Sequence, residues 1–569
     1  MSRRGARHQA AHPLSPTTLF TAAGIAPQRA LPLSNLLLMQ ALIAAGFGLG
    51  LLLDGPAWRG AVAGLVLALV LVVRRRGLSI PGVIARRLGF WWGTRPWVNT
   101  HNAQLCEPFD TDLPDGSQIG LVCDGRIVTS VLRIEVDPQA MIIMEPAMTV
   151  TGQTVSVQML ADCLQQFDIR LTSIDVISQG ARCHGHRDLA AIYDAVLGPL
   201  PAIAKRSVWV VVRLDPTMCT DAVRHRGGGW DGTLRTTATA TRRVANRLAD
   251  AGLRPHILTA AEITHATHEL SAGPDLSGID DTWLACRRGP LWLRSFSIKP
   301  SMFTTAGLEL LWTVPTHSTT VCVSLRRDER ADVLKVRALA RFNGYGRKSG
   351  PLRGLSDLRG RQYAALLCSV PSARIRQNIR AWLFANGDDA VRNLTLPASG
   401  CGQVVGADQR GRAVALPLFG PNIARVEICG TLHLAQQVVL RSLALGARVL
   451  IHTTRAGAWR AMVEQVGDPD VLQVSNPHRG TMQATSGRNY SVEVLDGEIE
   501  PMFRGGVTTM VVRPSHATPS PDADAALQLL DHDRDIVRVS TRAGSAVVTM
   551  VASPDEMRYI KSSFDTAGQ

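Results

Sequence analysis

The sequence predicts a two-helix transmembrane hairpin followed by an α/β (α+β) cytosolic region with two lobes and mixed sheets. Two apolar runs near the N-terminus, residues 36–53 and 58–73, predict the hairpin. Alternating strand-like and helix-like segments over residues 101–345 predict the first lobe, and a β-α-β-α pattern after Arg425 predicts the second. The 469 or so residues after the first 100, about two or three domains in length, are enough for this architecture.

Each apolar run has about the length that a helix needs to cross a hydrocarbon core, roughly 17–25 residues. Only Gln40 and the edge residue Arg59 are strongly polar, and residues 54–57 have the composition of a turn. Helices joined so closely place the N-terminus and the lobes on one side of the membrane. A cleaved signal peptide conflicts with the second apolar run that follows at once. A buried core hairpin conflicts with apolar residues on all helix faces.

Basic residues flank the predicted hairpin, residues 35–75, on both sides. The N-terminal arm, residues 1–34, carries four arginines and no acid, and residues 74–100 carry six arginines and no acid. Positive residues near a span favour the cytoplasmic side, so we expect a multi-pass inner-membrane protein with both termini in the cytoplasm. We interpret residues 76–100 as a basic, aromatic juxtamembrane segment along the anionic inner leaflet. A buried continuation of the second helix is the alternative.

Composition limits the partners and the redox environment. The formal net charge of +14 is concentrated near the predicted spans, which suits anionic lipid better than nucleic acid. The sequence contains no helix-turn-helix, RNP or paired zinc motif, so we expect no nucleic-acid binding. The ten cysteines are scattered and form no Cys-x-x-Cys pair. They are interpreted as small buried hydrophobic residues in a reducing compartment rather than as a disulfide framework.

The first predicted domain, residues 101–345, alternates between strand and helix patterns. An Asp-Gly pair at 124–125 predicts the two-residue turn of a β-hairpin. The remaining elements follow from hydrophobic periodicity. They are hairpin strands over 118–123 and 127–134, a helix over 155–167, a strand over 169–177, a helix over 188–198, a strand covered on both faces over 208–214, a mobile glycine-rich loop over 221–233, a helix over 234–251, strands over 291–298 and 319–326, and a helix near 304–312.

A linker with a helical connection, residues 346–395, precedes the second domain, residues 396–555. Short connections in its β-α-β-α run predict parallel strands. A polar tail, residues 556–569, is expected to fray. The run comprises a strand over 425–429, a helix to about 445, a strand over 448–452 and a helix around Trp459, with further strands over 507–512 and 545–551.

The second domain is predicted to lack a P-loop. At the first strand-helix junction the sequence is Gly430-Thr431-Leu432-His433, without the second glycine and the lysine that meet nucleotide phosphates. The helix N-terminus could attract an anion only weakly. Residues 344–349 contain glycines and a lysine but have the wrong spacing, and are interpreted as a solvated loop.

Other motifs predict no chemistry either. Cys183, His184 and His186 are potential metal ligands, but no matching pair follows downstream, so we interpret them as a surface loop. Residues 531–535 are a charged turn before a strand and lack the glycine and glutamate of an EF-hand. No G-x-S-x-G element supports a serine hydrolase. The sequence therefore predicts no catalytic, cofactor-binding or metal-binding residues.

Three stretches carry a resemblance to a known family. The predicted hairpin is followed by Arg74-Arg75-Arg76-Gly77, residues 119–129 surround a glycine turn, and residues 160–180, LADCLQQFDIRLTSIDVISQG, are the most specific block. In these stretches the chain resembles EccE, a membrane component of mycobacterial type VII (ESX) secretion systems. The resemblance covers residues 35–330 and, more loosely, 400–515.

The resemblance implies a structural, non-catalytic subunit of an inner-membrane protein secretion complex, peripheral in the assembly and stabilising it. The implied partners are EccB, EccC, EccD and the mycosin protease, with EccC as the ATP-driven motor. No catalytic residue, cofactor or metal is implied. The cytosolic domain of relatives has been likened to a glycosyltransferase-type fold. Here Asp110-Thr111-Asp112 matches the letters of a D-x-D motif, but it is expected in a loop before the first strand.

Two other functions stay open at this point. One is a membrane-tethered cytosolic enzyme of nucleotide-sugar transferase type, which predicts a deep polar pocket and stabilisation by a nucleotide or a divalent metal. The other is a tether that binds anionic lipid and recruits some other partner, for which salt should weaken binding to lipid.

Overall fold

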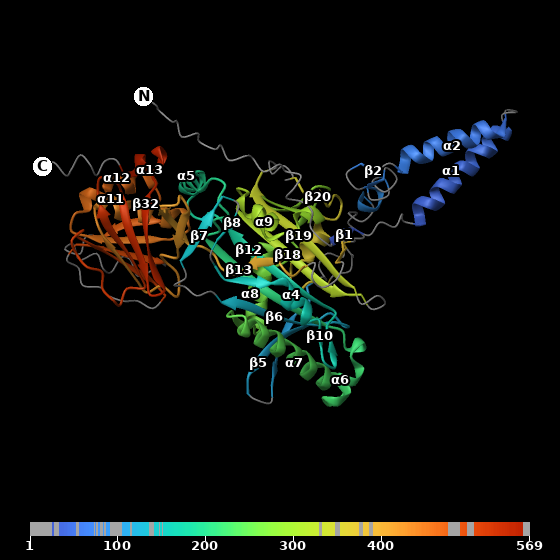
Figure 1. Ribbon diagram of the computed structural model, residues 1–569, viewed down its shortest axis with the longest axis horizontal. Helices are drawn as coiled ribbons and strands as arrows, with labels where there is room; N and C mark the ends of the chain where they lie inside the picture. Colours follow the sequence, from blue (N-terminus) through green and yellow to red (C-terminus); the bar gives the residue numbers. More distant parts are fainter. Residues whose placement is uncertain are drawn as a thin grey trace, which may run out of the picture.

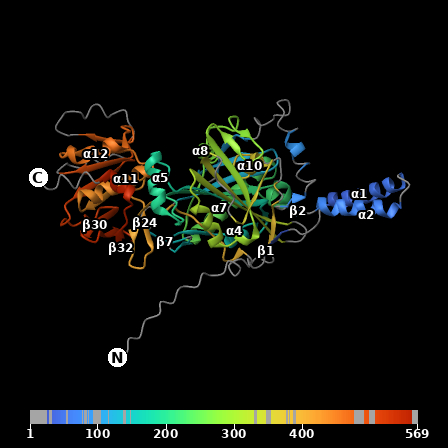
Figure 2. The same ribbon diagram turned by 90° about the horizontal axis from the view of Figure 1, so that it is seen from above.

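The chain forms a helical hairpin and two lobes, each built on one large β-sheet (Figure 1). In both views the hairpin lies beyond the first lobe, away from the second (Figure 2). The α+β class, the two lobes and the mixed sheet are confirmed. This computed structural model describes residues 25–27, 33–52, 56–72, 74–75, 78–79, 84, 87–91, 105–113, 116–135, 141–146, 148–150, 152–328, 333–346, 353–374, 379, 381–385, 391–475, 490–497 and 506–560.

Glycines bring the two helices of the hairpin, α1 (Leu33–Leu52) and α2 (Ala57–Val72), into close contact. A Cβ atom on Gly46 would lie 2.3 Å from the carbonyl oxygen of Gly60. One on Gly64 would lie 2.4 Å from the carbonyl oxygen of Leu42. A Cβ on Gly48, in contrast, would meet nothing within 4 Å. Packing inside the hairpin therefore explains Gly46, Gly60 and Gly64 but not Gly48.

Among the described residues, no helix is both long enough and apolar enough to cross a membrane. After α2, the short strands β2 (Arg74–Arg75) and β3 (Leu78–Ser79) pair with each other, so a helical continuation of α2 is wrong. Further along, the ring of Phe90 contacts Trp283 of the first lobe, with centroids 5.6 Å apart. Most of the predicted basic arm and of the segment 76–100 lies outside the described residues.

The first lobe is built on an antiparallel sheet, with the strand order β15-β16-β17-β19-β18-β12-β13-β6-β5-β4. Additional strands pair with this path: β14 with β6, β20 with β17, β21 with β19, and β1 with β21. The bounds are β1 (Ile25–Pro27), β4 (Pro108–Asp112), β5 (Gln118–Cys123), β6 (Val128–Glu135), β12 (Ser173–Ala181), β13 (Lys205–Leu214), β14 (Arg254–Ile257), β15 (Asp280–Asp281), β16 (Cys286–Arg288), β17 (Leu291–Ile298), β18 (Ser318–Arg327), β19 (Leu334–Tyr345), β20 (Leu355–Asp357) and β21 (Leu383–Ala385).

Helices cover both faces of this sheet, as the continuous apolar run in β13 predicts. Val208, Val210 and Val212 pack into one core with α4 and α7, whereas Trp209 and Val211 pack into another with α8 and α10. The helices are α4 (Val157–Asp162), α5 (Arg187–Leu197), α6 (Thr220–His225), α7 (Gly229–Asp250), α8 (Ala260–Ser271), α9 (Thr305–Glu309) and α10 (Gln362–Leu367). Two small pairs complete the lobe: β10 (Gln165–Gln166) with β11 (Ile169–Arg170), and β9 (Thr154–Ser156) with β22 (Thr395–Pro397).

The second lobe contains a mixed sheet, with the order β27-β26-β28-β29-β25-β30-β31-β32-β23-β24-β7-β8. Neighbouring strands in the series β27-β26-β28-β29-β25-β30 are parallel, as the β-α-β-α run predicts. The remaining neighbours in the sheet are antiparallel. The bounds are β7 (Ile142–Glu145), β8 (Met148–Thr149), β23 (Gln403–Ala407), β24 (Ala413–Leu416), β25 (Arg425–Cys429), α11 (Leu432–Ala444), β26 (Val449–Thr453), α12 (Ala456–Val466), β27 (Leu472–Ser475), β28 (Val492–Asp496), β29 (Thr508–Arg513), β30 (Ala525–Asp531), β31 (Ile536–Thr541), β32 (Gly544–Met550) and α13 (Pro554–Ile560).

Strands β7 and β8 belong to the second sheet although they precede most of the first lobe in sequence. Ile142, Ile143 and Met144 pair with Ala415, Val414 and Ala413 of β24. From the sequence these residues are expected in the first domain, because a local pattern contains no information on a partner about 270 residues away. The proposed division at residues 345 and 396 remains a prediction for the rest of the chain.

Four local expectations are wrong. The helix expected over 155–167 extends only over α4, because residues 154–156 form β9 and residues 165–166 form β10. The glycine-rich segment 221–233 is mostly helical, because Gly232 lets α7 approach α6: a Cβ there would lie 2.4 Å from the carbonyl oxygen of Val223. The start of the tail does not fray, because Glu556 and Ile560 of α13 are buried. Residues 110–112 lie in the edge strand β4 rather than in a loop.

Candidate functional site: the junction of the two lobes

Helix α5 lies between the two lobes (Figure 1). It connects β12 to β13 of the first sheet, but it packs against α11 of the second lobe. Leu189, Tyr193 and Leu197 of α5 are buried in the core of the second lobe. The apolar face of α5 repeats every three to four residues, which explains why the sequence predicts a helix here but does not reveal its partner.

Arg182 fixes α5 to the first lobe. Its guanidinium donates hydrogen bonds to the Asp194 carboxylate (2.6 Å) and to the carbonyl oxygens of Gly198 (2.9 Å) and Leu200 (2.6 Å). The Arg182 side chain is almost fully buried, with Asp194 half-buried beside it. Because Gly198 ends α5, the arginine also satisfies a carbonyl oxygen at the helix C-terminus.

The loop before α5 fixes this helix to the second lobe. The amides of Gly185 and His186 donate to the carbonyl oxygens of Ala444 (3.0 Å) and Leu443 (3.3 Å) at the end of α11. A Cβ atom on Gly185 would lie 1.8 Å from the Leu443 carbonyl oxygen, so only glycine allows this approach. Backbone contacts of this kind define the separation of the two lobes closely.

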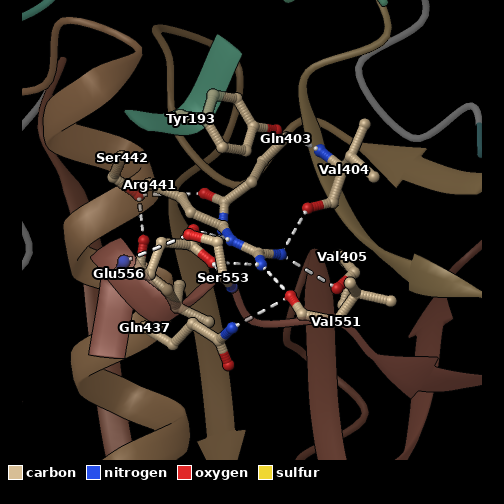
Figure 3. A network of polar contacts seen from close by, with 11 residues as sticks. Tyr193, Gln403, Val404, Val405, Gln437, Arg441, Ser442, Val551, Ser553 and Glu556 are labelled. Carbon is tan, nitrogen blue, oxygen red and sulfur yellow. Dashed lines mark hydrogen bonds and ion pairs between the residues drawn. The ribbon is translucent and has the colours of Figure 1, made fainter. Parts of the chain in front are cut away.

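A buried arginine forms the centre of the network on the second-lobe side (Figure 3). Arg441 of α11 pairs with Glu556 of α13 through two contacts, at 2.9 and 3.1 Å. It also donates to the carbonyl oxygens of Val404 (3.0 Å), Val405 (3.1 Å) and Val551. Both charged side chains are at most 2% exposed. The guanidinium therefore joins α11 to α13, to β23 and to the residue that follows β32, mostly through buried groups.

Tyr193 extends this network to α5. The amide of Val404 donates to the Tyr193 hydroxyl at 2.8 Å, and the Arg441 guanidinium lies 5.8 Å from the centroid of the tyrosine ring. Burial raises the pKa of Tyr193 far above its ordinary value, so the phenol stays neutral. One side chain from the α5 connection thus satisfies a buried backbone group of the second sheet.

A cavity of about 100 Å³ remains between the lobes, and a buried cation and a buried acid line it. Arg206 lies over the ring of Trp312 at 4.0 Å and donates to Ser178, while its Nε atom has no hydrogen-bond partner. Glu309 accepts from the amide of Thr149 at 2.8 Å. Burial lowers the pKa of Arg206 to about 10 and raises that of Glu309. The volume is sufficient for a few ordered waters, each of about 30 Å³, between these groups.

The motifs considered for metal and phosphate binding are used structurally. Cys183 packs against the core of the second lobe, whereas the His184 ring contacts Gly446. In the described part of the chain, no three His, Cys, Asp or Glu side chains gather as metal ligands. At the glycine-containing turn considered for phosphate binding, the Gly430 amide donates to the Arg513 carbonyl oxygen, and the Thr431 hydroxyl caps α11.

Two acidic motifs also have local roles. Asp110 of the D-x-D letters accepts a hydrogen bond from the Ala260 amide at 2.7 Å, at the N-terminus of α8. Asp531 accepts from the amides of Asp533 and Arg534 in the turn between β30 and β31, which confirms the predicted charged turn. Of residues 344–349, Gly344 and Tyr345 end β19, and 347–349 lie outside the described residues.

Sequence reasoning missed the junction, although part of it was visible. Ser553 and Glu556 have the spacing of a capping box, and each caps the other's backbone amide at 3.1 Å. Arg441 follows directly on the apolar residues Val438, Val439 and Leu440 of α11, and a charge in such a position needs a buried partner. Nothing in either signal indicates Tyr193, which lies more than 200 positions earlier in the chain than its partner Val404.

Comparison with known proteins shows which family the chain resembles. A family model described as "Putative type VII ESX secretion system translocon, EccE" matches residues 202–298, which include β13, α7 and α8 of the first lobe. Named relatives extend the similarity over most of the chain, and the resemblance to the EccE family is confirmed: the chain is related to EccE proteins.

Three relatives show how much of the chain this similarity covers. The chain is 23% identical over 433 residues to "ESX-2 secretion system protein EccE2" of Mycobacterium tuberculosis (strain CDC 1551 / Oshkosh), which covers 73% of this chain and 78% of that protein. It is 23% identical over 432 residues to "ESX-1 secretion system protein EccE1" of Mycolicibacterium smegmatis, which covers 74% and 84%. It is 26% identical over 242 residues to "ESX-5 secretion system protein EccE5" of Mycobacterium marinum, which covers 41% and 59%.

Proposed function

We propose that this protein is a structural, non-catalytic subunit of an inner-membrane type VII (ESX) secretion complex, peripheral in the assembly and stabilising it. The observation that carries the proposal is the junction, whose buried side chains are used to hold two lobes together. Arg441, Glu556, Arg182 and Tyr193 are all occupied by protein groups. A rigid two-lobed body suits a component that maintains the spacing of its neighbours. The names of the relatives support membership of a secretion system.

The hairpin is the proposed membrane anchor. Leu52 is 82% exposed, Trp58 63% and Leu51 58%, although each is large and apolar. Leaving such side chains in water forgoes roughly 1.5–3 kcal/mol apiece, which supports their burial in lipid. The arginines on both flanks support a cytoplasmic location of the two termini and the lobes.

The proposed partners follow from the family resemblance. They are EccB, EccC, EccD and the mycosin protease, with anionic lipid of the inner leaflet along residues 76–100. No nucleic-acid partner is proposed. In this proposal the motor function belongs to EccC, because the connection between β25 and α11 at Gly430 carries no P-loop lysine.

Affinity purification from membranes tests the proposal. A tagged full-length chain, extracted with a mild detergent, should elute in a large assembly together with other type VII components. Elution as a monodisperse monomer without those components would contradict the structural role.

A separate experiment tests sidedness. Protease added to intact spheroplasts should leave both lobes undigested and should cleave them only after the membrane is opened. Digestion in intact spheroplasts would contradict the cytoplasmic placement but not the assembly.

A further inference from the structure

A polar pocket of about 410 Å³ opens on the first lobe, next to the junction. It lies where β12, β13, β18 and β19 end, and its lining includes His184 from the loop that contacts the second lobe. This volume falls within the range of about 300–1,000 Å³ that is typical of small-molecule sites. The junction explains the position of His184 but gives the pocket itself no role.

Hydrogen-bond donors gather at the rim of the pocket. Lys205, His184 and His317 line it with part of each side chain exposed and the rest covered by protein, and the described residues provide no ion-pair partner for Lys205 within 4 Å. Burial, with Lys205 and His317 nearby, lowers the pKa of His184, and burial lowers that of His317, so both imidazoles are neutral donors at neutral pH. The His317 ring is held against Tyr345, with centroids 5.2 Å apart. One cation and two N–H groups form a site suited to an anion.

Hydrogen-bond acceptors lie at the floor. Asn343 is 2% exposed and donates to Ser318 at 2.8 Å, but its Oδ1 atom has no partner. Glu269 accepts from Ser207 at 3.3 Å through one carboxylate oxygen. An unpaired buried acceptor destabilises the folded protein, and a donor from a ligand would satisfy it. A carboxylate at the floor also disfavours a second negative group on the ligand.

We propose that this pocket binds a small phosphorylated polyol. Its phosphate lies between Lys205, His184 and His317, and its hydroxyl groups donate to Asn343 and Glu269. The combination of a basic rim and an acidic floor selects one anionic end and one hydroxylated end. The pocket lies beside the junction, whereas the hairpin lies beyond the other end of the first lobe (Figure 2), so the soluble phosphate ester is favoured over a lipid headgroup.

Calorimetric titration of the detergent-solubilised full chain tests the proposal, with glucose 6-phosphate and glycerol 3-phosphate as probes. Saturable binding is expected for at least one probe. Lys205→Gln should weaken it about tenfold, the loss of one charge-assisted contact. Lys299→Gln, at an exposed lysine that does not line the pocket, should leave it unchanged.

Further titrations separate the contribution of the acidic floor from that of the basic rim. They also distinguish a soluble phosphate ester from a lipid headgroup as the ligand. Glu269→Gln should reduce the preference for glucose 6-phosphate over inorganic phosphate, because a charged acceptor is lost. No saturable binding by either ester, or equal affinity in the Lys205→Gln chain, would overturn the proposal. So would equal affinity for inorganic phosphate, or binding only to phosphatidylglycerol vesicles. These outcomes are independent of the secretion-complex proposal, which concerns assembly.

Discussion

At the residue scale, charged side chains inside the lobes are positioned by backbone groups as much as by opposite charges. Arg441 contacts three carbonyl oxygens besides Glu556, and Arg182 contacts two at the end of α5 besides Asp194. Removing water from such groups is costly unless every donor finds a partner. The consequence is that these residues define one arrangement of the surrounding elements.

Truncating Arg441 should destabilise the second lobe strongly. Arg441→Met leaves Glu556 buried without its cation, and breaking a buried pair costs about 3–5 kcal/mol. Hydrogen exchange of the α13 amides under native conditions measures the loss. Arg460→Met, at an exposed arginine of α12, is the matched control and should change stability by less than about 0.5 kcal/mol. Equal exchange rates in the two variants would show that the Arg441–Glu556 pair does not stabilise the second lobe.

Asp281 should make stability depend on pH. Burial raises its pKa to about 7, against an ordinary value near 3.8. Ionised Asp281 therefore penalises the folded state above pH 7, and the penalty disappears as the pH falls toward 4. Asp281→Asn should raise the unfolding free energy at pH 8 by about 2 kcal/mol and not at pH 4, the gain being limited by partial exposure of the side chain.

Chemical denaturation of the full chain at both pH values measures this effect. Asp280→Asn, at the exposed neighbouring position, should be neutral at either pH. A stabilisation of the Asp281→Asn chain that is the same at pH 4 and pH 8 would show that ionisation is not its cause.

At the element scale, hydrophobic periodicity predicted most strands and the long helices, because their inward and outward residues alternate with a fixed period. Strand β13 is the clearest case, since its even and odd positions fill separate cores. The start of α7 was missed because Gly227, Gly228 and Gly229 suggest a loop. Their positive φ angles lead into the helix, and Gly232 then allows the close contact with α6.

Glycine substitutions in the hairpin should separate its internal contact from its outer face. Gly46→Val places a side chain against the Gly60 carbonyl group, whereas Gly48→Val points into open space. Both changes have the same intrinsic effect on a helix, so their difference reports packing, and overpacking costs about 1–3 kcal/mol. Faster hydrogen exchange over residues 33–72 is expected for Gly46→Val alone. Equal exchange in both variants would mean that α1 and α2 do not pack in this way.

At the scale of the whole molecule, two segments from the first half of the chain extend into the second lobe. Helix α5 reaches from the first lobe to the second, and β7 joins the second sheet. Neither could be predicted from sequence, because each depends on partners far away along the chain, which local periodicity does not encode. The candidate site was therefore missed, although the spacing of Ser553 and Glu556 could have indicated their mutual cap.

A side chain at Gly185 should disrupt the contact between the loop before α5 and the second lobe. Gly185→Ala places a methyl group against backbone atoms of Leu443 and Gly446, which cannot move independently. Cleavage by trypsin at the exposed Arg187 should become several-fold faster, as the local opening free energy falls by about 1–3 kcal/mol. Gly457→Ala, where a Cβ meets nothing within 4 Å, is the control and should cleave at the original rate. Unchanged cleavage in Gly185→Ala would show that the loop does not determine access to α5.

The transfer of β7 to the second sheet has a practical consequence for fragments. A polypeptide that starts at residue 396 would lack the strand that pairs with Ala413–Ala415, and would leave an uncovered edge of backbone amides and carbonyls. Such edges recruit strands from other molecules. Truncated C-terminal preparations should therefore self-associate unless residues 141–150 are supplied, either fused or as a peptide.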